Sequence, residues 1–125
     1  MRALVVDDSR AMRTILTKML TELDFEVGQA EDGIAALAQM RRDVPAVALV
    51  DWNMPNMNGL ELVLAIRRQR GYADVKLMMV TTESEMHQIM RALEAGADEY
   101  VTKPFTRDVI VEKLEILGFP VAEHA

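Results

Sequence analysis

Short apolar runs alternate with longer amphipathic segments along this chain of 125 residues, and this alternation constrains the fold more than any other feature. Three runs, at residues 3–6, 47–50 and 77–80, are built from Ala, Val, Leu and Met, and polar residues follow each of them. Strands that are buried on both faces of a sheet have such continuous apolar sequences. Two further runs, at residues 25–30 and 99–102, mix polar and apolar residues, which is typical of edge strands. We therefore predict three central strands and two edge strands.

The segments between these runs carry apolar residues at the three- and four-residue spacing of an amphipathic helix, whose apolar stripe faces the core. The positions that mark the five predicted helices are Met12, Ile15, Leu16, Met19, Leu20 and Leu23; Ile34, Leu37 and Ala38; Leu60, Val63, Leu64 and Ile66; Met86, Ile89, Met90 and Leu93; and Val109, Ile110, Leu114 and Leu117. Ser9, Asn58 and Thr106 are candidate N-caps, because their side-chain oxygens can accept a hydrogen bond from the first turn. Gly96 and Gly118 predict the ends of the last two helices.

The resulting order, a strand followed by a helix five times over, predicts a parallel sheet with helices on both faces. With the second and fifth strands at the edges, the strand order is 2-1-3-4-5, which is the flavodoxin-like doubly wound α/β arrangement. The chain contains no internal repeat and no linker. We expect residues 1–125 to form one domain of ordinary size.

The composition excludes several classes of function. The chain contains no cysteine, which removes disulfides, thiolate nucleophiles and zinc sites built from cysteine. Its formal net charge of −6 at pH 7 argues against binding of nucleic acid, which requires a basic surface. The N-terminal apolar run is too short for a signal peptide, and no segment approaches the length of a transmembrane span. We therefore expect a cytoplasmic protein that binds neither nucleic acid nor a membrane.

Charged or hydroxyl-bearing residues follow four of the predicted strands. Asp7 and Asp8 follow the first strand, and Asp51 follows the third. Thr81 follows the fourth strand, and Lys103 comes directly after the fifth. In doubly wound sheets, ligands bind at the carboxyl ends of the strands near the switch in strand order, which lies here between the first and third strands. We expect these residues to share one crevice.

The chemistry of such a crevice is restricted by its charges. Three clustered carboxylates repel one another, so a cation must balance them or some of them must take up protons. All the available ligands are hard oxygens, which favours Mg²⁺ over zinc. A carboxylate can also attack phosphorus and form an aspartyl phosphate, while a metal ion and a lysine stabilise the charge on the transferring phosphoryl group.

Four sequence motifs contain these residues: VVDDS at 5–9, DWNMPNMNG at 51–59, VTTE at 80–83 and YVTKPF at 100–105. In their order and spacing they resemble the receiver domains of two-component response regulators, and the chemotaxis members of that family most of all. The resemblance covers essentially the whole chain. It implies a signalling switch rather than an enzyme, since a receiver domain assists only its own phosphorylation and dephosphorylation.

The resemblance also implies a role for each residue of the crevice. Asp51 is the phosphoacceptor. Asp8, Asp51 and the backbone carbonyl of Asn53 bind Mg²⁺ directly, and Asp7 acts mainly through a metal-bound water. Lys103 pairs with an oxygen of the phosphoryl group.

A second set of residues is implied to switch and to time the signal. Thr81 hydrogen-bonds to the phosphoryl group, and Tyr100 then moves inward. Asn53 and Glu83 tune the lifetime of the aspartyl phosphate, and this combination implies a short-lived phosphorylated state. The Lys103–Pro104 bond is expected to be cis.

The implied partners are proteins. The phosphoryl donor is a phosphohistidine on a histidine kinase or phosphotransfer domain, which would dock near the first helix at Arg10, Met12 and Arg13. A protein effector would bind the face formed by the fourth helix, fifth strand and fifth helix, with Met90 and Tyr100 as candidate contacts. The sequence leaves open the kinase, the effector, the choice between a chemotaxis effector and a phosphorelay shuttle, and dimerisation on activation.

Two other functions stay open at this point. The first is a receiver-like binding module whose contacts do not depend on phosphorylation, although the complete acidic set argues against it. The second is an aspartyl-phosphate phosphatase. Those enzymes commonly carry a second acid two residues after the nucleophile, and Asn53 occupies that position here.

Overall fold

The computed structural model describes residues 1–121 and confirms the predicted alternation of strands and helices. The strands are β1 (Arg2–Val6), β2 (Glu26–Ala30), β3 (Val47–Val50), β4 (Lys76–Thr81) and β5 (Glu99–Thr102). The helices are α1 (Arg10–Glu22), α2 (Gly33–Arg42), α3 (Gly59–Arg67), α4 (Met86–Ala95) and α5 (Arg107–Ile116), with a short 3₁₀ helix at Arg70–Tyr72. The last four residues of the predicted domain, 122–125, lie outside the described residues.

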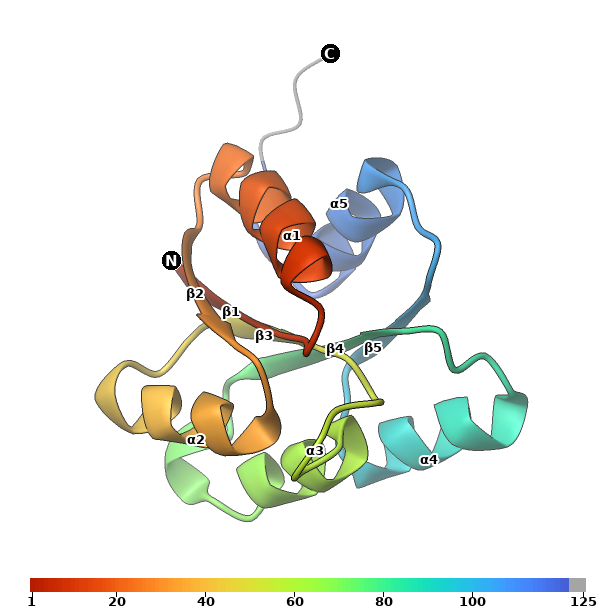
Figure 1. Ribbon diagram of the computed structural model, residues 1–125. Helices are drawn as coiled ribbons and strands as arrows, with labels where there is room; N and C mark the ends of the chain where they lie inside the picture. The colour runs from red at the N-terminus through yellow and green to blue at the C-terminus, as the bar shows by residue number, and fades with distance from the viewer. Residues whose placement is uncertain (122–125) are drawn as a thin grey trace.

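All strand pairs are parallel, and the strand order is β2-β1-β3-β4-β5, as predicted. Val6 pairs with Val50, and Val50 pairs with Met79, so the carboxyl ends of β1 and β3 lie level and β4 continues past them to Thr81. Helices α1 and α5 cover one face of the sheet, and α2, α3 and α4 cover the other (Figure 1). Every side chain that leaves these strand ends therefore starts from the same edge of the sheet.

The core consists of two mainly aliphatic layers, one on each face of the sheet. Successive residues of a strand point to opposite faces, so Val5 packs with α1 and α5 while Val6 packs with α2 and α3. Burying one side chain of this kind stabilises the fold by roughly 1.5–3 kcal/mol. Met40, Met78 and Met79 are fully buried and fill these layers. The rigid sheet edge on which the site is built is thus held from both sides.

The predicted helix ends agree with the structure. The Ser9, Asn58 and Thr106 side chains accept hydrogen bonds from the backbone N–H groups three residues later. Gly96 and Gly118 follow α4 and α5 with φ angles of 123° and 98°, in the left-handed region that glycine tolerates.

The predicted stripe of α4 is not buried, and the exposure of Met90 agrees with its other interpretation as a surface contact. Met86, Met90 and Leu93 are 70%, 47% and 40% exposed, and Ala92 is the one buried residue of this helix. The spacing located the helix correctly, but the small residue Ala92 lies against the sheet and the larger apolar side chains face outward. Ile34 on α2 is likewise 57% exposed. Periodicity identifies a helix and does not by itself decide which of its faces the tertiary contacts cover.

Candidate metal and phosphoryl site

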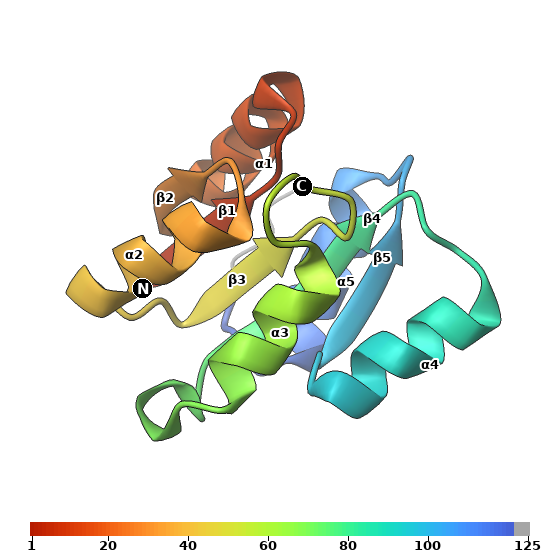
Figure 2. The same cartoon turned by 60° about the horizontal axis from the view of Figure 1, so that its bottom comes forward.

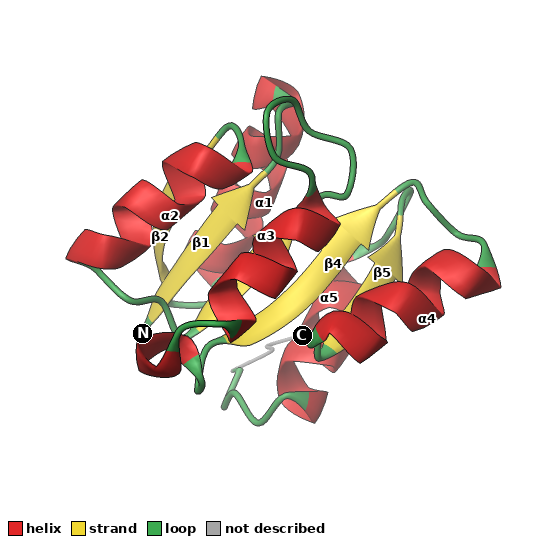
Figure 3. Ribbon diagram, turned by 90° about the horizontal axis from the view of Figure 1, so that it is seen from below, coloured by secondary structure: helices red, strands yellow, loops and turns green. Residues whose placement is uncertain are grey.

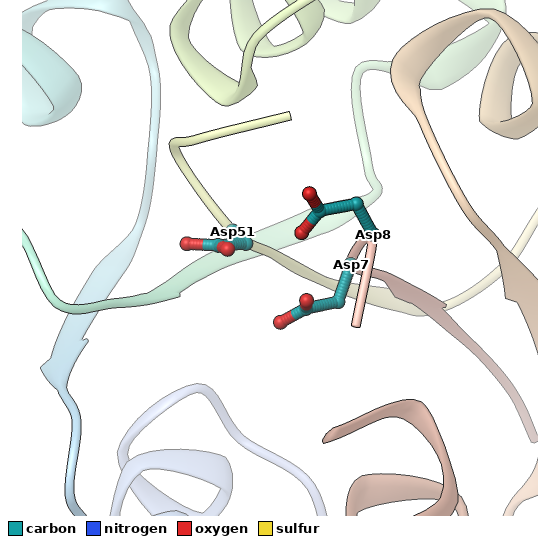
Figure 4. A group of neighbouring side chains, drawn as sticks. All are labelled: Asp7, Asp8 and Asp51. Atoms are coloured by element: carbon teal, nitrogen blue, oxygen red, sulfur yellow. The ribbon is translucent and has the colours of Figure 1, made fainter. Parts of the chain in front are cut away.

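The carboxyl ends of β1 and β3 bring three carboxylates together (Figure 4). Asp7 and Asp8 come directly after β1, and Asp51 comes directly after β3. The Asp51 backbone N–H donates a hydrogen bond of 2.9 Å to the Val6 carbonyl, which fixes the two strand ends side by side. Each of the three residues offers one carboxylate oxygen, and these atoms all lie within 4.8 Å of one another. A single ion can therefore contact all three.

Asp51 is a buried acid directly after β3. It is only 8% exposed, and burial raises the pKa of its carboxyl group above the ordinary value, even though the Thr81 hydroxyl and the Lys103 ammonium lower it. The Asp51 Oδ1 atom is buried and accepts no hydrogen bond from the described residues. A buried acceptor without a partner is costly. This oxygen is free to receive a ligand.

Lys103 connects two of the acids from the far side of the cluster. It follows β5, and its Nζ atom lies 2.8 Å from Asp7 Oδ2 and 3.5 Å from Asp51 Oδ2. Its backbone N–H donates to the Thr81 carbonyl at 2.8 Å, which holds the lysine beside β4. The Lys103–Pro104 peptide bond is cis, as expected. The structure therefore places the ammonium group where it faces any anion bound at Asp51.

Asp7 is held rigidly by its own neighbours. It is 1% exposed, and its Oδ1 atom accepts a hydrogen bond of 2.8 Å from the Ser9 N–H. The Arg13 guanidinium donates to the Asp7 carbonyl at 2.8 Å and to the Gln29 side chain at 3.3 Å. Sequence reasoning considered Arg13 only as a docking residue and missed this contact, which follows from the side chain reaching back over the start of α1.

The residues after β4 form a second group, centred on Glu83. The Asn53 amide donates to the Glu83 carboxylate at 2.8 Å, and the Tyr100 hydroxyl donates to the Glu83 carbonyl at 2.7 Å. Thr81 is fully buried, and its hydroxyl accepts from the Glu83 N–H at 3.3 Å. Burial, together with the negative charges of Glu83 and Asp51, raises the pKa of Tyr100 to about 12. One residue thus links the loop after β3, the end of β4 and strand β5.

Figure 2 shows the loops after β3 and β4 at the same end of the sheet, where the strand arrows point. The loop after β3 is fixed by a close approach at Gly59, since a Cβ atom there would lie 2.3 Å from the Asp51 carbonyl oxygen. Only glycine allows this contact. Trp52, directly after Asp51, is 8% exposed and packs into the core. Sequence reasoning listed Gly59 as part of a motif but could not show that it touches the acceptor.

These donors fit a hard divalent cation. Asp8 is exposed, and it lines the same surface hollow as Asn53, so the cluster is open to solvent on that side. The nearby groups are oxygens of carboxylates, hydroxyls and backbone carbonyls, which suit Mg²⁺ and do not suit zinc. The unpartnered Asp51 oxygen supplies a ligand that a cation would satisfy. The acidic cluster can therefore hold a metal ion.

The sheet thus carries three acids and one lysine at its carboxyl edge, next to the switch in strand order. A family model, described as the response regulator receiver domain, matches residues 3–115. The chain belongs to the response regulator receiver domain family.

Named relatives agree in length and in shape. The chain is 46% identical to a chemotaxis protein CheY homolog of Campylobacter jejuni, over the whole of this chain and 98% of that one. It is 41% identical to the chemotaxis protein CheY1 of Helicobacter pylori, over 94% of this chain and 96% of that one. The structure of the Vibrio cholerae chemotaxis protein CheY4 matches with a TM-score of 0.88 and 33% identity, over 93% of this chain and 97% of that one.

A search for membrane-spanning helices in the described part of the chain found none of sufficient length and apolar character.

Proposed function

We propose that this protein is a phosphoacceptor response regulator of two-component signalling, in which Asp51 takes a phosphoryl group with the help of Mg²⁺. One observation carries the proposal. The Asp51 Oδ1 atom is buried without a hydrogen-bond partner, and it lies in a cluster with two other acids and Lys103 at the switch point of the sheet. An ordinary turn-forming aspartate would have its oxygens satisfied by backbone N–H groups or by water.

Mg²⁺ would be held by Asp8, Asp51 and the backbone carbonyl of Asn53, with Asp7 acting mainly through a bound water. When bound, it supplies positive charge that balances the carboxylates and the phosphoryl oxygens. Asp51 would attack the phosphorus of a phosphohistidine, so that a new oxygen–phosphorus bond forms as the nitrogen–phosphorus bond breaks and the imidazole leaves. The Lys103 ammonium, already 3.5 Å from Asp51, would then stabilise the oxygens of the transferred group.

The lifetime of the phosphorylated state is proposed to depend on Asn53 and Glu83. Their side chains hydrogen-bond to each other, and Asn53 lines the surface hollow beside Asp8. They therefore stand where a water molecule would approach the phosphoryl group. We expect a short-lived aspartyl phosphate, and a phosphoryl half-life of hours would contradict this.

The signal would pass through the same group of residues to the face of α4, β5 and α5. Thr81 would hydrogen-bond to the phosphoryl group, and any shift of Thr81 reaches Tyr100 through Glu83. Exposed Met86, Met90 and Leu93 on α4 give this face an apolar surface suited to a protein effector.

We propose chemotaxis as the setting, because relatives that match nearly the full chain are named chemotaxis proteins. The donor is a histidine kinase or phosphotransfer domain. The whole of residues 1–125 acts as one receiver domain, without enzymatic activity beyond its own phosphorylation and dephosphorylation. A cytoplasmic location, with no binding of nucleic acid or membrane, remains part of this proposal.

Incubation with a small phosphoryl donor such as a phosphoramidate tests the proposal. We expect Mg²⁺-dependent addition of one phosphoryl group to the intact protein, detected by mass spectrometry, and no addition to Asp51→Asn. Lys103→Met should bind Mg²⁺ yet accept the phosphoryl group slowly. Modification of Asp51→Asn equal to that of the wild type would contradict the assignment.

Two outcomes would favour the alternatives. Effector binding that is equal in wild type and Asp51→Ala would point to a binding module that works without phosphorylation. Multiple turnover of a generic phosphate ester would point to a phosphatase, against which the amide at position 53 argues.

A further inference from the structure

The loop after β3 contains a strained turn at Asn56. This residue has a φ angle of 69°, in the left-handed region that residues other than glycine rarely adopt. The backbone N–H of Met57 donates to the carbonyl of Pro55 at 2.7 Å, which closes a three-residue turn around Asn56. Turns of this kind with a positive central φ are rare and strained. Such strain persists only where the surroundings hold it in place.

The Asn56 side chain ties this turn to α2. Its amide donates to Asp32 Oδ2 at 3.0 Å, while Asp32 Oδ1 accepts from the Ala35 N–H at 2.8 Å as the N-cap of α2. One carboxylate oxygen of Asp32 thus caps α2, and the other accepts a hydrogen bond from the loop after β3. The hydrogen bond from Ala35, with that from Asn56, lowers the pKa of Asp32.

A second contact supports the same junction. The Met57 side chain lies against Gly33, the first residue of α2, so closely that a Cβ atom on Gly33 would be 2.7 Å from Met57 Sδ. Figure 2 shows the loop after β3 beside the first turn of α2. The loop is therefore held at its tip by α2 and not only at its ends by β3 and α3.

Asn53 lies between two fixed points of this loop. On one side, the Gly59 N–H donates to the Trp52 carbonyl at 2.8 Å and holds the two ends of the loop together. On the other side, the Asn56 turn is held by Asp32. Asn53 and Pro55 line the hollow beside Asp8, so this stretch of backbone borders the acidic cluster of Asp7, Asp8 and Asp51.

We propose that Asn56 and Asp32 are positioning residues for the metal site: their hydrogen bond holds the strained turn and so aims the Asn53 backbone carbonyl at the ion. The inference rests on the proposed function and extends it to residues that touch neither the ion nor the phosphoryl group. Partners that orient a metal ligand in this way typically change metal affinity when they are removed.

Two substitutions break the hydrogen bond while sparing other contacts. Asn56→Gly keeps the positive φ and removes the amide. Asp32→Ser keeps a capping oxygen for α2 but is too short to reach the loop. We expect each to raise the Mg²⁺ dissociation constant, measured by Trp52 fluorescence, by on the order of ten-fold. The double variant should have the same Mg²⁺ dissociation constant as the single variants, because both substitutions break the same hydrogen bond.

Three controls separate positioning from charge and from stability. Asp32→Asn removes the negative charge but leaves a side-chain amide that can donate to the Asn56 oxygen once the Asn56 amide turns over, so its Mg²⁺ affinity should stay close to that of the wild type. Thr106→Ala removes the N-cap of α5 and leaves the hydrogen bond between Asn56 and Asp32 intact, so it should lower the free energy of unfolding by about 1 kcal/mol with unchanged Mg²⁺ affinity. Urea unfolding of every variant gives the stability comparison.

The outcomes distinguish this inference from the proposed function. If the wild type binds Mg²⁺ and both Asn56→Gly and Asp32→Ser bind it within two-fold of the wild type, the positioning role is overturned and the proposed function stands. Weakening in Asp32→Asn equal to that in Asp32→Ser would assign the effect to charge and overturn it as well. A folded wild type without a Mg²⁺ response would overturn both.

Discussion

Helices α3 and α4 lie side by side on the same face of the sheet (Figure 3), but very different interactions hold them there. Helix α3 has a capping box between Asn58 and Glu61 at its start. At its end, the Arg67 guanidinium donates to three backbone carbonyls and to the Asp98 carboxylate. The residues of α3 that are buried are Gly59, Leu60, Leu62, Val63 and Ile66.

Helix α4 shares only one of these supports, the hydrogen bond from Arg67 to the carbonyl of Gly96 directly after its last residue. Ala92 is its one buried residue, and its N-cap residue Glu85 makes no side-chain capping bond. The Gln88 Oε1 atom is buried without a hydrogen-bond partner among the described residues. Little apolar area and an unsatisfied polar group make α4 the more weakly held of the two helices.

On the proposed function, this difference would give the two helices different parts in a switch. The first residue of α3 contacts the backbone of Asp51, so a rigid α3 keeps Asp51 in place. Helix α4 follows the loop that carries Glu83, so a change at the site reaches an element that few contacts restrain. Segments that move in switching proteins come from the weakly held part of a fold.

The largest expected effect comes from truncating one apolar side chain in each helix. Ile66→Ala in α3 should lower the free energy of unfolding by about 2–5 kcal/mol, because Ile66 is fully buried. Met90→Ala in α4 should change it by less than about 0.5 kcal/mol, because Met90 is 47% exposed. Urea denaturation measures both, and similar losses in the two variants would break the comparison.

The next effect concerns the contact between α3 and the acceptor. Gly59→Ala should destabilise the protein by roughly 1–3 kcal/mol, since the new Cβ atom would overlap the Asp51 backbone. The same variant should weaken the binding of Mg²⁺, because Asp51 must move. Gly71→Ala is the matched control, with no atom within 4 Å of the added Cβ. Wild-type stability in Gly59→Ala would show that α3 does not hold the acceptor.

The helix caps give a smaller pair of effects with opposite signs. Asn58→Ala removes the cap of α3 and should cost about 0.5–2 kcal/mol. Glu85→Asp offers α4 the cap that it lacks and should stabilise the protein by a few tenths of a kcal/mol up to about 1 kcal/mol. Thermal unfolding of both variants checks the two signs. A loss of stability in Glu85→Asp would mean that the first backbone N–H groups of α4 gain nothing from a side-chain cap.

The smallest effect is on the pH dependence of stability. It concerns Asp51, which the well-held helix α3 contacts. Burial raises the pKa of Asp51 in the folded state above its ordinary value of 3.8. At a pH between the ordinary pKa and the raised pKa of the folded state, the folded protein binds more protons than the unfolded chain. The free energy of unfolding therefore falls as the pH rises through this range. Asp51→Asn should remove this part of the decline and make the metal-free protein more stable near neutral pH.

Urea unfolding in the presence of a chelator, at several values from about pH 4 to about pH 7, measures this dependence. Glu112→Gln, an exposed carboxylate on α5, is the control for loss of one negative charge. If the free energies of unfolding of the wild type and Asp51→Asn change with pH in parallel, the burial of Asp51 does not lower stability near neutral pH.

Much of the fold was predictable because its signals are local. Continuous apolar runs located the central strands, and side-chain caps located the starts of three helices. The strand order followed from the more polar edge strands. The outward stripe of α4 was not predictable, because its exposure depends on which tertiary contacts form and not on spacing along the chain.

The same limit applies to the site. The residues that the structure brings together at the strand ends were predictable, because parallel strands deliver them to one edge. The contacts of Arg13, Gly59 and Asn56 were not, since each joins segments that are distant in sequence or depends on a backbone angle. Their roles in binding Mg²⁺ and a phosphoryl group remain predictions.

Trp52 fluorescence tests the central claim most directly, because this single tryptophan adjoins Asp51 and is 8% exposed. Mg²⁺ is titrated first, and beryllium fluoride is then added as a mimic of the phosphoryl group, with Asp51→Asn as the control. The account predicts a saturable response to Mg²⁺ and a further change with beryllium fluoride that the variant lacks. No response to either ligand, in protein shown to be folded, would contradict a phosphoacceptor site at Asp51.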